Sequence, residues 1–237
     1  MQTAALSLFR FDRVRDRLWV LGQMATARPA LARLPGLSFC KLCGSGTGEG
    51  FTPRANTAVW AILSVWADAG TARAQTAEAA VFRRWRDRAG ESWTVFLAPV
   101  SARGAWSGRA PFTPATAPAE GPLAALTRAT IRPSRMMRFW EREPAISARI
   151  GADPNVIFKI GIGEVPFLHQ VTFSIWPDAA AMSAFARTGA HAEAIRAVRA
   201  EGWFTEELYA RFRVTGSVGR WQGKDPLANQ TIKESAA

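Results

Sequence analysis

The sequence of 237 residues is 48% hydrophobic, which is enough to bury one large core or two small ones and excludes a disordered chain. Its 30 Lys and Arg residues exceed its 19 Asp and Glu residues, and the net charge of +11 favours anionic partners. The basic residues are dispersed and form no lysine-rich arm, so we expect no nucleic-acid partner. The 10 Trp and 14 Phe residues fit either a heavy core or a site for a large apolar ligand.

Cysteine usage and hydropathy bear on the cellular compartment. Cys40 and Cys43 have no second pair in the chain, so by themselves they build neither a disulfide framework nor a zinc site. The first residues lack an apolar run with a cleavage signature, and no window approaches the roughly 18 apolar residues of a membrane span. The sequence therefore predicts a cytoplasmic protein with reduced thiols.

The first half of the chain predicts six elements. A strand (Leu6–Phe11) and an amphipathic helix (Arg13–Met24) come first, and a hairpin follows whose second strand is Asn56–Trp66. A helix then leads to a last strand at Trp93–Val100. This β-α-β-β-α-β order is typical of a ferredoxin-like unit.

A glycine-rich segment lies within the predicted hairpin. Residues 44–50 read Gly-Ser-Gly-Thr-Gly-Glu-Gly, but they lack the Gly-Lys-Ser/Thr of a Walker loop. Glu49 also stands where a dinucleotide-binding motif needs its third glycine. We interpret the segment as a hairpin turn that needs positive φ, and we expect no nucleotide site.

The second half predicts the same order of elements. A strand (Leu126–Ile131) and a helix (Pro133–Arg142) precede a hairpin that ends in the strand His169–Trp176, and Tyr209–Thr215 forms the last strand. Residues 174–178, Ser-Ile-Trp-Pro-Asp, repeat the pattern of residues 64–68, Ser-Val-Trp-Ala-Asp. We therefore expect an α+β fold in which tandem ferredoxin-like repeats pair face to face as a pseudo-dimeric α+β barrel.

The composition also divides the chain. Four prolines interrupt the segment between the halves, which has neither helical nor strand periodicity and is typical of an extended linker. The expected parts are a first half at 1–106, a proline-rich linker at 107–124, a second half at 125–221 and a polar tail at 222–237.

The two histidines are the candidate functional residues, since neither lies in a signature of a Ser-His-acid triad. His191 opens a predicted helix and shares an apolar stripe with Ile195 and Val198, so we expect it to face the core. His169 lies on a strand with alternating apolar residues, and we expect it to face the layer between sheet and helices. Each could be a hydrogen-bonded core residue, but a neutral imidazole is also a common axial ligand of haem iron.

Two further residue types bear on a haem site. Arginine binds carboxylates well, and Arg128, Arg132 and Arg211 on the second half's strands are candidate partners of haem propionates, although each could be an ordinary surface charge. A thiolate from Cys40 or Cys43 is the competing axial ligand, but nothing in the sequence marks either thiol as ionised.

Several long segments together resemble a known family over the whole chain. They are SLFRFD, KLCGSGTGEGFTP, LTRATIRPSR, FKIGIGEVP, VTFSIWPD, HAEAIRAVRAEGWFTEELYARF and DPL. In these segments the sequence resembles the spheroidene monooxygenase family of photosynthetic purple bacteria.

The resemblance implies an activity, cofactors and partners. It implies a carotenoid monooxygenase that uses O2 to place a C-2 hydroxyl and then a keto group on acyclic carotenoids, converting spheroidene to spheroidenone. It implies haem b as cofactor, reduced ferredoxin as electron donor and a position peripheral to the anionic photosynthetic membrane. In analogy with haem proteins of this barrel type, His191 becomes the expected axial ligand and His169 a distal hydrogen-bond donor.

Two other function classes stay open at this point. One is a cofactor-free oxygenase of the antibiotic-biosynthesis monooxygenase type, in which an activated substrate meets O2 directly; a hydrocarbon end group lacks the electron density for that reaction. The other is a non-catalytic protein that binds haem or carotenoid.

Overall fold

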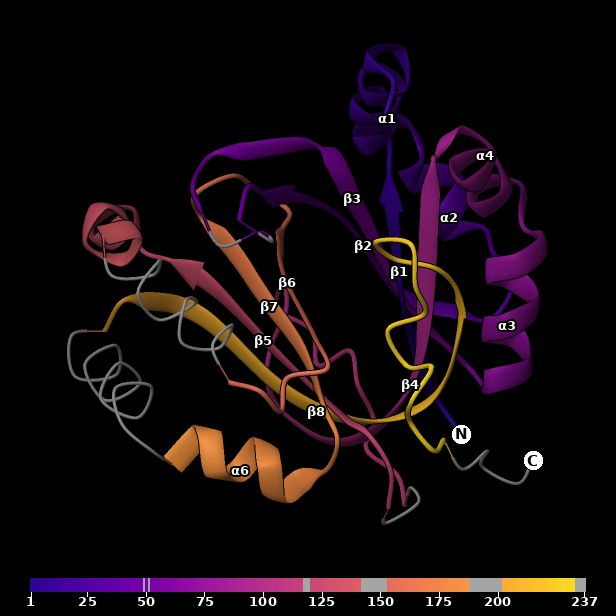
Figure 1. Ribbon diagram of the computed structural model, residues 1–237. Helices are drawn as coiled ribbons and strands as arrows, with labels where there is room; N and C mark the ends of the chain where they lie inside the picture. Colours follow the sequence, from indigo (N-terminus) through magenta and orange to yellow (C-terminus); the bar gives the residue numbers. More distant parts are fainter. Residues whose placement is uncertain (49, 51, 117–119, 142–152, 188–201, 233–237) are drawn as a thin grey trace.

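Eight antiparallel strands form a closed barrel with helices on its outside (Figure 1). The computed structural model describes residues 1–48, 50, 52–116, 120–141, 153–187 and 202–232. Around the barrel the strand order is β1-β3-β2-β6-β7-β5-β8-β4. The expected α+β barrel is confirmed. Within the described residues, no helix combines the length and hydropathy needed to cross a bilayer.

The first four strands follow the predicted order with shifted ends, and two successive helices stand at each place where one helix was expected. These elements are β1 (Thr3–Arg10), α1 (Val14–Thr26), α2 (Arg28–Ala32), β2 (Leu37–Gly46), β3 (Ala55–Trp66), α3 (Ala69–Glu78), α4 (Ala80–Arg88) and β4 (Glu91–Gly104). The glycine-rich segment forms the end of β2 and the start of its turn to β3, with Gly48 and Gly50 at positive φ. The prediction of a hairpin turn there is confirmed.

The second half again places four strands in the barrel. Its elements are β5 (Leu123–Ile131), η1 (Pro133–Arg135), a helix over residues 136–141, β6 (Phe158–Gly163), β7 (His169–Trp176), α6 (Ala179–Arg187) and β8 (Phe204–Gly219). The bounds of β7 match the sequence-based expectation, whereas the helix expected at Pro133–Arg142 begins as a 3-10 turn. The helix predicted at 190–200 lies outside the described residues.

The buried side chains form an inner core and outer layers. One cluster takes residues from all eight strands and fills the barrel, while a second joins strands of the first half to its helices. Val171, Phe173 and Ile175 of β7 belong to the inner cluster. The expectation that this row faces the layer between sheet and helices was therefore wrong for Val171, Phe173 and Ile175. Alternation alone could not decide the side, because the carboxyl end of β7 is buried on both faces.

The two halves carry matching local structures at the repeated sequence motif. In each, a tryptophan N–H donates to the serine two residues before it over 2.9 Å, and an aspartate accepts a 2.8 Å bond from a backbone N–H at a helix start. The pairs are Trp66 with Ser64, Trp176 with Ser174, Thr71 with Asp68, and Ala181 with Asp178. The shared motif therefore encodes the same strand end and helix start twice.

The segments expected as linker and tail both contribute to the inner core. Phe112 is 4% exposed, and its ring meets that of Phe212 edge-on with 4.8 Å between centroids. Leu227, within the segment expected as a polar tail, is 3% exposed in the same cluster. Both segments thus help to fill the barrel, and the division of the chain into domains stays a prediction.

The halves meet at two seams of unequal length. Strands β4 and β8 pair from Trp93 to Gly104, whereas β2 and β6 share only the pairs Gly44 with Gly163 and Ser45 with Ile162. Beside this short seam the chain at Gly50 lies close to Gly161, and a Cβ built on Gly161 would stand 2.4 Å from the Gly50 carbonyl oxygen. Only glycine permits this approach of two backbones.

We predict that Gly161→Ala lowers the free energy of unfolding by about 1–3 kcal/mol, because the added methyl must push two backbones apart. Urea denaturation measures the change. Gly22→Ala on α1 is the matched control, since beyond its chain neighbours and the backbone of its own helix no heavy atom lies within 4 Å of its new methyl, and alanine favours helix. Equal stability of Gly161→Ala and the wild type would contradict the close contact.

Candidate functional site

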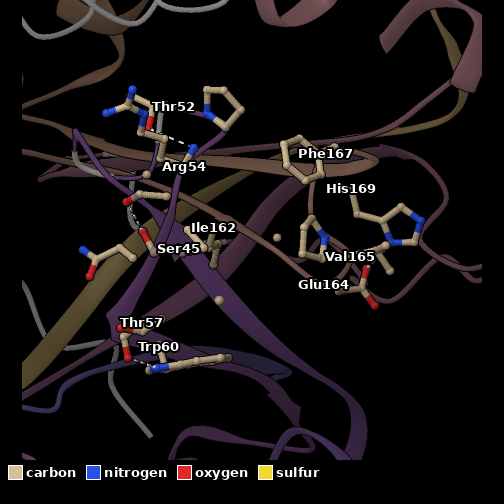
Figure 2. Close-up of a pocket in the computed structure, with 18 of the residues that line it drawn as sticks. Ser45, Thr52, Arg54, Thr57, Trp60, Ile162, Glu164, Val165, Phe167 and His169 are labelled. Atoms are coloured by element: carbon tan, nitrogen blue, oxygen red, sulfur yellow. Dashed lines mark hydrogen bonds and ion pairs between the residues drawn. The ribbon is translucent and has the colours of Figure 1, made fainter. Parts of the chain in front are cut away.

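A cleft of about 540 Å³ opens beside the short seam between β2 and β6 (Figure 2). Its wall combines α1, the β2–β3 hairpin, the β6–β7 hairpin and Trp140 from the helix over 136–141. Leu18, Leu21, Met24 and Trp60 give it an apolar lining. A cleft of this size and character is suited to a large apolar ligand or cofactor.

His169, the first residue of β7, lies on the wall of this cleft. Its side chain is 24% exposed, and its Nδ1 atom is buried without a hydrogen-bond partner. Burial lowers the pKa of His169 from its ordinary value of 6.5, and the charge of Glu164 opposes that shift. A neutral imidazole in a largely apolar cleft can give or take a proton near neutral pH.

Glu164 is the centre of an ionic cluster beside His169. Its Oε2 lies 3.6 Å from the His169 Nδ1 and accepts a 2.5 Å hydrogen bond from the Trp106 indole, while its Oε1 lies 2.7 Å from the Lys41 Nζ. Figure 2 shows the Glu164 carboxylate beside the His169 ring on the β6–β7 hairpin. The cluster holds the carboxylate in one position against the histidine.

Glu164 also separates two pockets. It lines the apolar cleft and a second pocket of about 380 Å³, which has Lys41 and Arg109 on its wall. Glu164 therefore borders both an apolar and a more polar pocket.

Arg128 is buried, with its side chain 1% exposed, and does not line the cleft. Its guanidinium pairs with Glu206 and lies 3.9 Å from Glu164. Burial would raise the pKa of Glu206, but hydrogen bonds from the Gly108 and Ser107 N–H groups and the charge of Arg128 lower it. The observed partners of Arg128 are thus carboxylates of the protein itself.

The other two arginines expected as propionate partners also lie away from the cleft wall. Arg132 is exposed and donates from Nε to the Gly202 carbonyl over 2.8 Å, and Arg211 is exposed on β8. The described arginines that do line the cleft are Arg17 and Arg54. The assignment of Arg128, Arg132 and Arg211 to a cofactor stays a prediction.

Three residues were candidate axial ligands: His191, Cys40 and Cys43. The structure describes the two cysteines, whereas His191 lies outside the described residues. Burial raises the pKa of Cys40 to about 12 and that of Cys43 well above its usual range, so a thiolate is disfavoured at both. The described residues hold no group of three His, Cys, Asp or Glu for a metal ion, whereas haem needs only one axial protein ligand.

Reasoning from the sequence missed the cluster around Glu164. Lys41, Trp106 and Arg128 are far from Glu164 in the chain, and barrel closure brings them together. One signal was present: Glu164 is the only acidic residue between Phe158 and His169.

We predict that His169 titrates below pH 6.5 and that Glu164→Gln lowers its pKa further, because the variant removes the carboxylate that favours the charged ring. NMR of histidine-labelled protein measures both values, and a His169→Gln variant identifies the signal. Glu78→Gln on the remote helix α3 is the control. An unchanged His169 pKa in Glu164→Gln would contradict the contact between the two side chains.

The lowered pKa of His169 also makes the stability of the protein depend on pH. Because the pKa is lower in the folded state, the neutral ring adds stability above pH 6.5, and that stability is lost as the pH falls through the folded-state pKa.

Comparison with known structures supports the fold. Two crystal structures of aldoxime dehydratase match with TM-scores of 0.61, at 12% and 10% identity. The alignments cover 92% of this chain and 84% of the first structure, and 97% and 81% for the second, which is a complex with butyraldoxime. At this identity the likeness shows the barrel architecture alone.

Comparison with known sequences shows the family, although no family model matches the chain. The spheroidene monooxygenase of Rhodobacter capsulatus is 53% identical over the full length of both chains. That of Cereibacter sphaeroides is 56% identical over 96% of this chain and 71% of its own length. The Rubrivivax gelatinosus enzyme is 38% identical, covering 88% and 80%. The chain belongs to the spheroidene monooxygenase family.

Proposed function

We propose that the protein is a haem-dependent monooxygenase that places a C-2 hydroxyl and then a keto group on acyclic carotenoids, converting spheroidene to spheroidenone. The activity on a carotenoid follows from the names of its relatives. The structural observation that carries the proposal is the apolar cleft with His169 on its wall, whose buried Nδ1 has no hydrogen-bond partner and lies 3.6 Å from Glu164. A long polyene requires an apolar cleft of this kind.

The residues of the cleft fit a haem b. Its lining is apolar, His169 offers an imidazole, and Arg17 and Arg54 can pair with propionates. The high pKa values of Cys40 and Cys43 favour histidine over thiolate as the ligand, and we assign that role to His191 on the family resemblance. When bound, the haem would supply the binding and reductive activation of O2.

The chain's own residues would then donate hydrogen bonds into the cleft and limit the entry of water. Monooxygenation consumes one O2, two electrons and two protons for each hydroxyl formed, and the second oxygen atom leaves as water. The His169 ring can donate one hydrogen bond into the cleft, and the Glu164 carboxylate next to Nδ1 can stabilise the ring when it is protonated. Lys41 and Trp106 hold Glu164 in place, while the apolar lining limits entry of water.

The partners follow from the reaction and from the charge. Two electrons must come from a donor protein, and we infer reduced ferredoxin. The net charge of +11 favours an acidic donor and an anionic membrane. We further infer a cytoplasmic protein peripheral to the photosynthetic membrane, with no nucleic-acid partner.

We also infer that the barrel consists of tandem ferredoxin-like repeats. The strand order β4-β1-β3-β2 of the first half matches β8-β5-β7-β6 of the second. The paired tryptophan and aspartate contacts at Ser64–Asp68 and Ser174–Asp178 support the same origin for both halves.

We predict that purified wild-type protein shows a Soret band and that His191→Ala loses haem or shifts this band, because the axial ligand is removed. Absorbance spectra and a haem assay on the same samples measure this. Full wild-type absorbance in His191→Ala would overturn the ligand assignment. Colourless, haem-free protein that still oxygenates spheroidene would favour the cofactor-free alternative.

We predict that His169→Ala keeps its haem but turns over about 100-fold more slowly, because general acid–base catalysis typically contributes at least that much. Product formation from spheroidene with O2 and reduced ferredoxin gives the rate, and the Soret band gives the haem content. Loss of haem in His169→Ala would mean that the two histidine roles are reversed. Haem without turnover in the wild type would favour a non-catalytic carrier.

A further inference from the structure

We propose that the mouth of the cleft is a surface that inserts into the headgroup region of an anionic lipid bilayer. The surface, called the cleft rim below, consists of exposed apolar side chains on three elements. They are Val14, Leu18 and Leu21 of α1, Val165 and Phe167 of the β6–β7 hairpin, and Met137 of the helix over 136–141.

Exposed apolar residues are concentrated at this one place. Of the nine large hydrophobic side chains that are exposed in the described part of the chain, five line the cleft. Met137, 72% exposed, adds a sixth, because it lies on the same helix as the cleft residue Trp140. Scattered exposed leucines need no explanation, whereas a contiguous apolar patch around a cleft marks an interaction site.

Phe167 is held outward at a cost in backbone energy. Its φ is +66°, which is unfavourable for a bulky residue, and its side chain is 47% exposed. The Trp140 indole donates to the Phe167 carbonyl over 3.0 Å and stands edge-on to its ring. An aromatic pair at the rim suits the membrane interface, where Trp and Phe are favoured.

Basic side chains surround the apolar rim. Exposed Arg13 precedes Val14 at the start of α1, Arg54 lines the cleft, and exposed Arg138 follows Met137. The acidic side chains close by in the sequence are Asp12, Asp16, Glu49, Glu141, Glu143 and Glu164. Asp12 and Asp16 are ion-paired with Arg10 and Arg88, and Glu164 is ion-paired with Lys41. Arginines around an apolar surface are complementary to anionic lipid headgroups.

The rim elements lie toward one end of the molecule. In Figure 1, α1 and the helix over 136–141 are both in the upper half of the view, together with the turn of the β2–β3 hairpin. Residues of α1 and Trp140 of the helix over 136–141 line the same cleft, so both helices border its mouth.

The choice of a bilayer as partner rests on the proposed function. A long polyene is dissolved in lipid and is insoluble in water. A cleft whose mouth is seated in the headgroup region would accept the polyene from the bilayer without its passage through water. The cleft rim itself consists of exposed apolar side chains with arginines around them and needs no bound cofactor.

The test is flotation of the purified holoprotein with carotenoid-free vesicles. We expect the wild type to float with vesicles of equimolar phosphatidylglycerol and phosphatidylcholine, and less with phosphatidylcholine alone. The triple variant Leu18→Ser, Leu21→Ser, Phe167→Ser should bind anionic vesicles at least about tenfold more weakly, because three inserted side chains are lost. The matched control is Val100→Ser with Val218→Ser, which removes exposed apolar side chains away from the rim and should float like the wild type.

Three results would overturn the proposal. They are failure of the wild type to float, equal flotation of the triple variant, and a wild-type dimer in gel filtration that the triple variant abolishes. Circular dichroism and urea denaturation of all three proteins check the fold. Ketone formation from detergent-dispersed spheroidene is measured separately. A wild type that forms the ketone but does not float defeats only this inference, and one that floats without forming the ketone defeats only the proposed function.

Discussion

Closure of the barrel through main-chain hydrogen bonds between the two halves is the constraint on which the site depends. One seam, between β4 and β8, is long, and the other, between β2 and β6, has only two residue pairs. Strand edges must be paired or covered to satisfy their backbone groups. Both pockets lie along the short seam, one lined by Gly44 to Gly46 and the other by Ser38 to Leu42, and Glu164 borders each.

The same seam determines the electrostatics of the site. Burial of a carboxylate is costly unless cations and hydrogen-bond donors compensate for the lost water. Lys41 from β2, Trp106 from the segment after β4 and Arg128 from β5 supply that compensation to Glu164. His169, by contrast, has no hydrogen-bond partner for its buried Nδ1. The structure thus satisfies the acid and leaves the imidazole available for chemistry.

The sequence was sufficient to predict the bounds of six of the barrel's eight strands approximately, because these have a clear apolar pattern, but it set no bounds for β2 and β6. It placed β7 at His169–Trp176 and identified the α+β barrel. It assigned the wrong face to β7, because that strand is buried on both sides near its end. The contact of Glu164 with Lys41 could not be predicted, since it requires the register of β2 against β6. The role of His191 rests on resemblance to the family.

The proposed function requires that the cleft can hold a haem and that His169 can donate a hydrogen bond toward it. The most direct measurement is the infrared C–O stretching band of carbon monoxide bound to the reduced haem protein. Because this frequency responds to nearby hydrogen-bond donors, we predict that His169→Ala shifts the band, while Val218→Ser, away from the cleft, leaves it unchanged. A band at the same frequency in His169→Ala and the wild type would contradict the proposed role of His169.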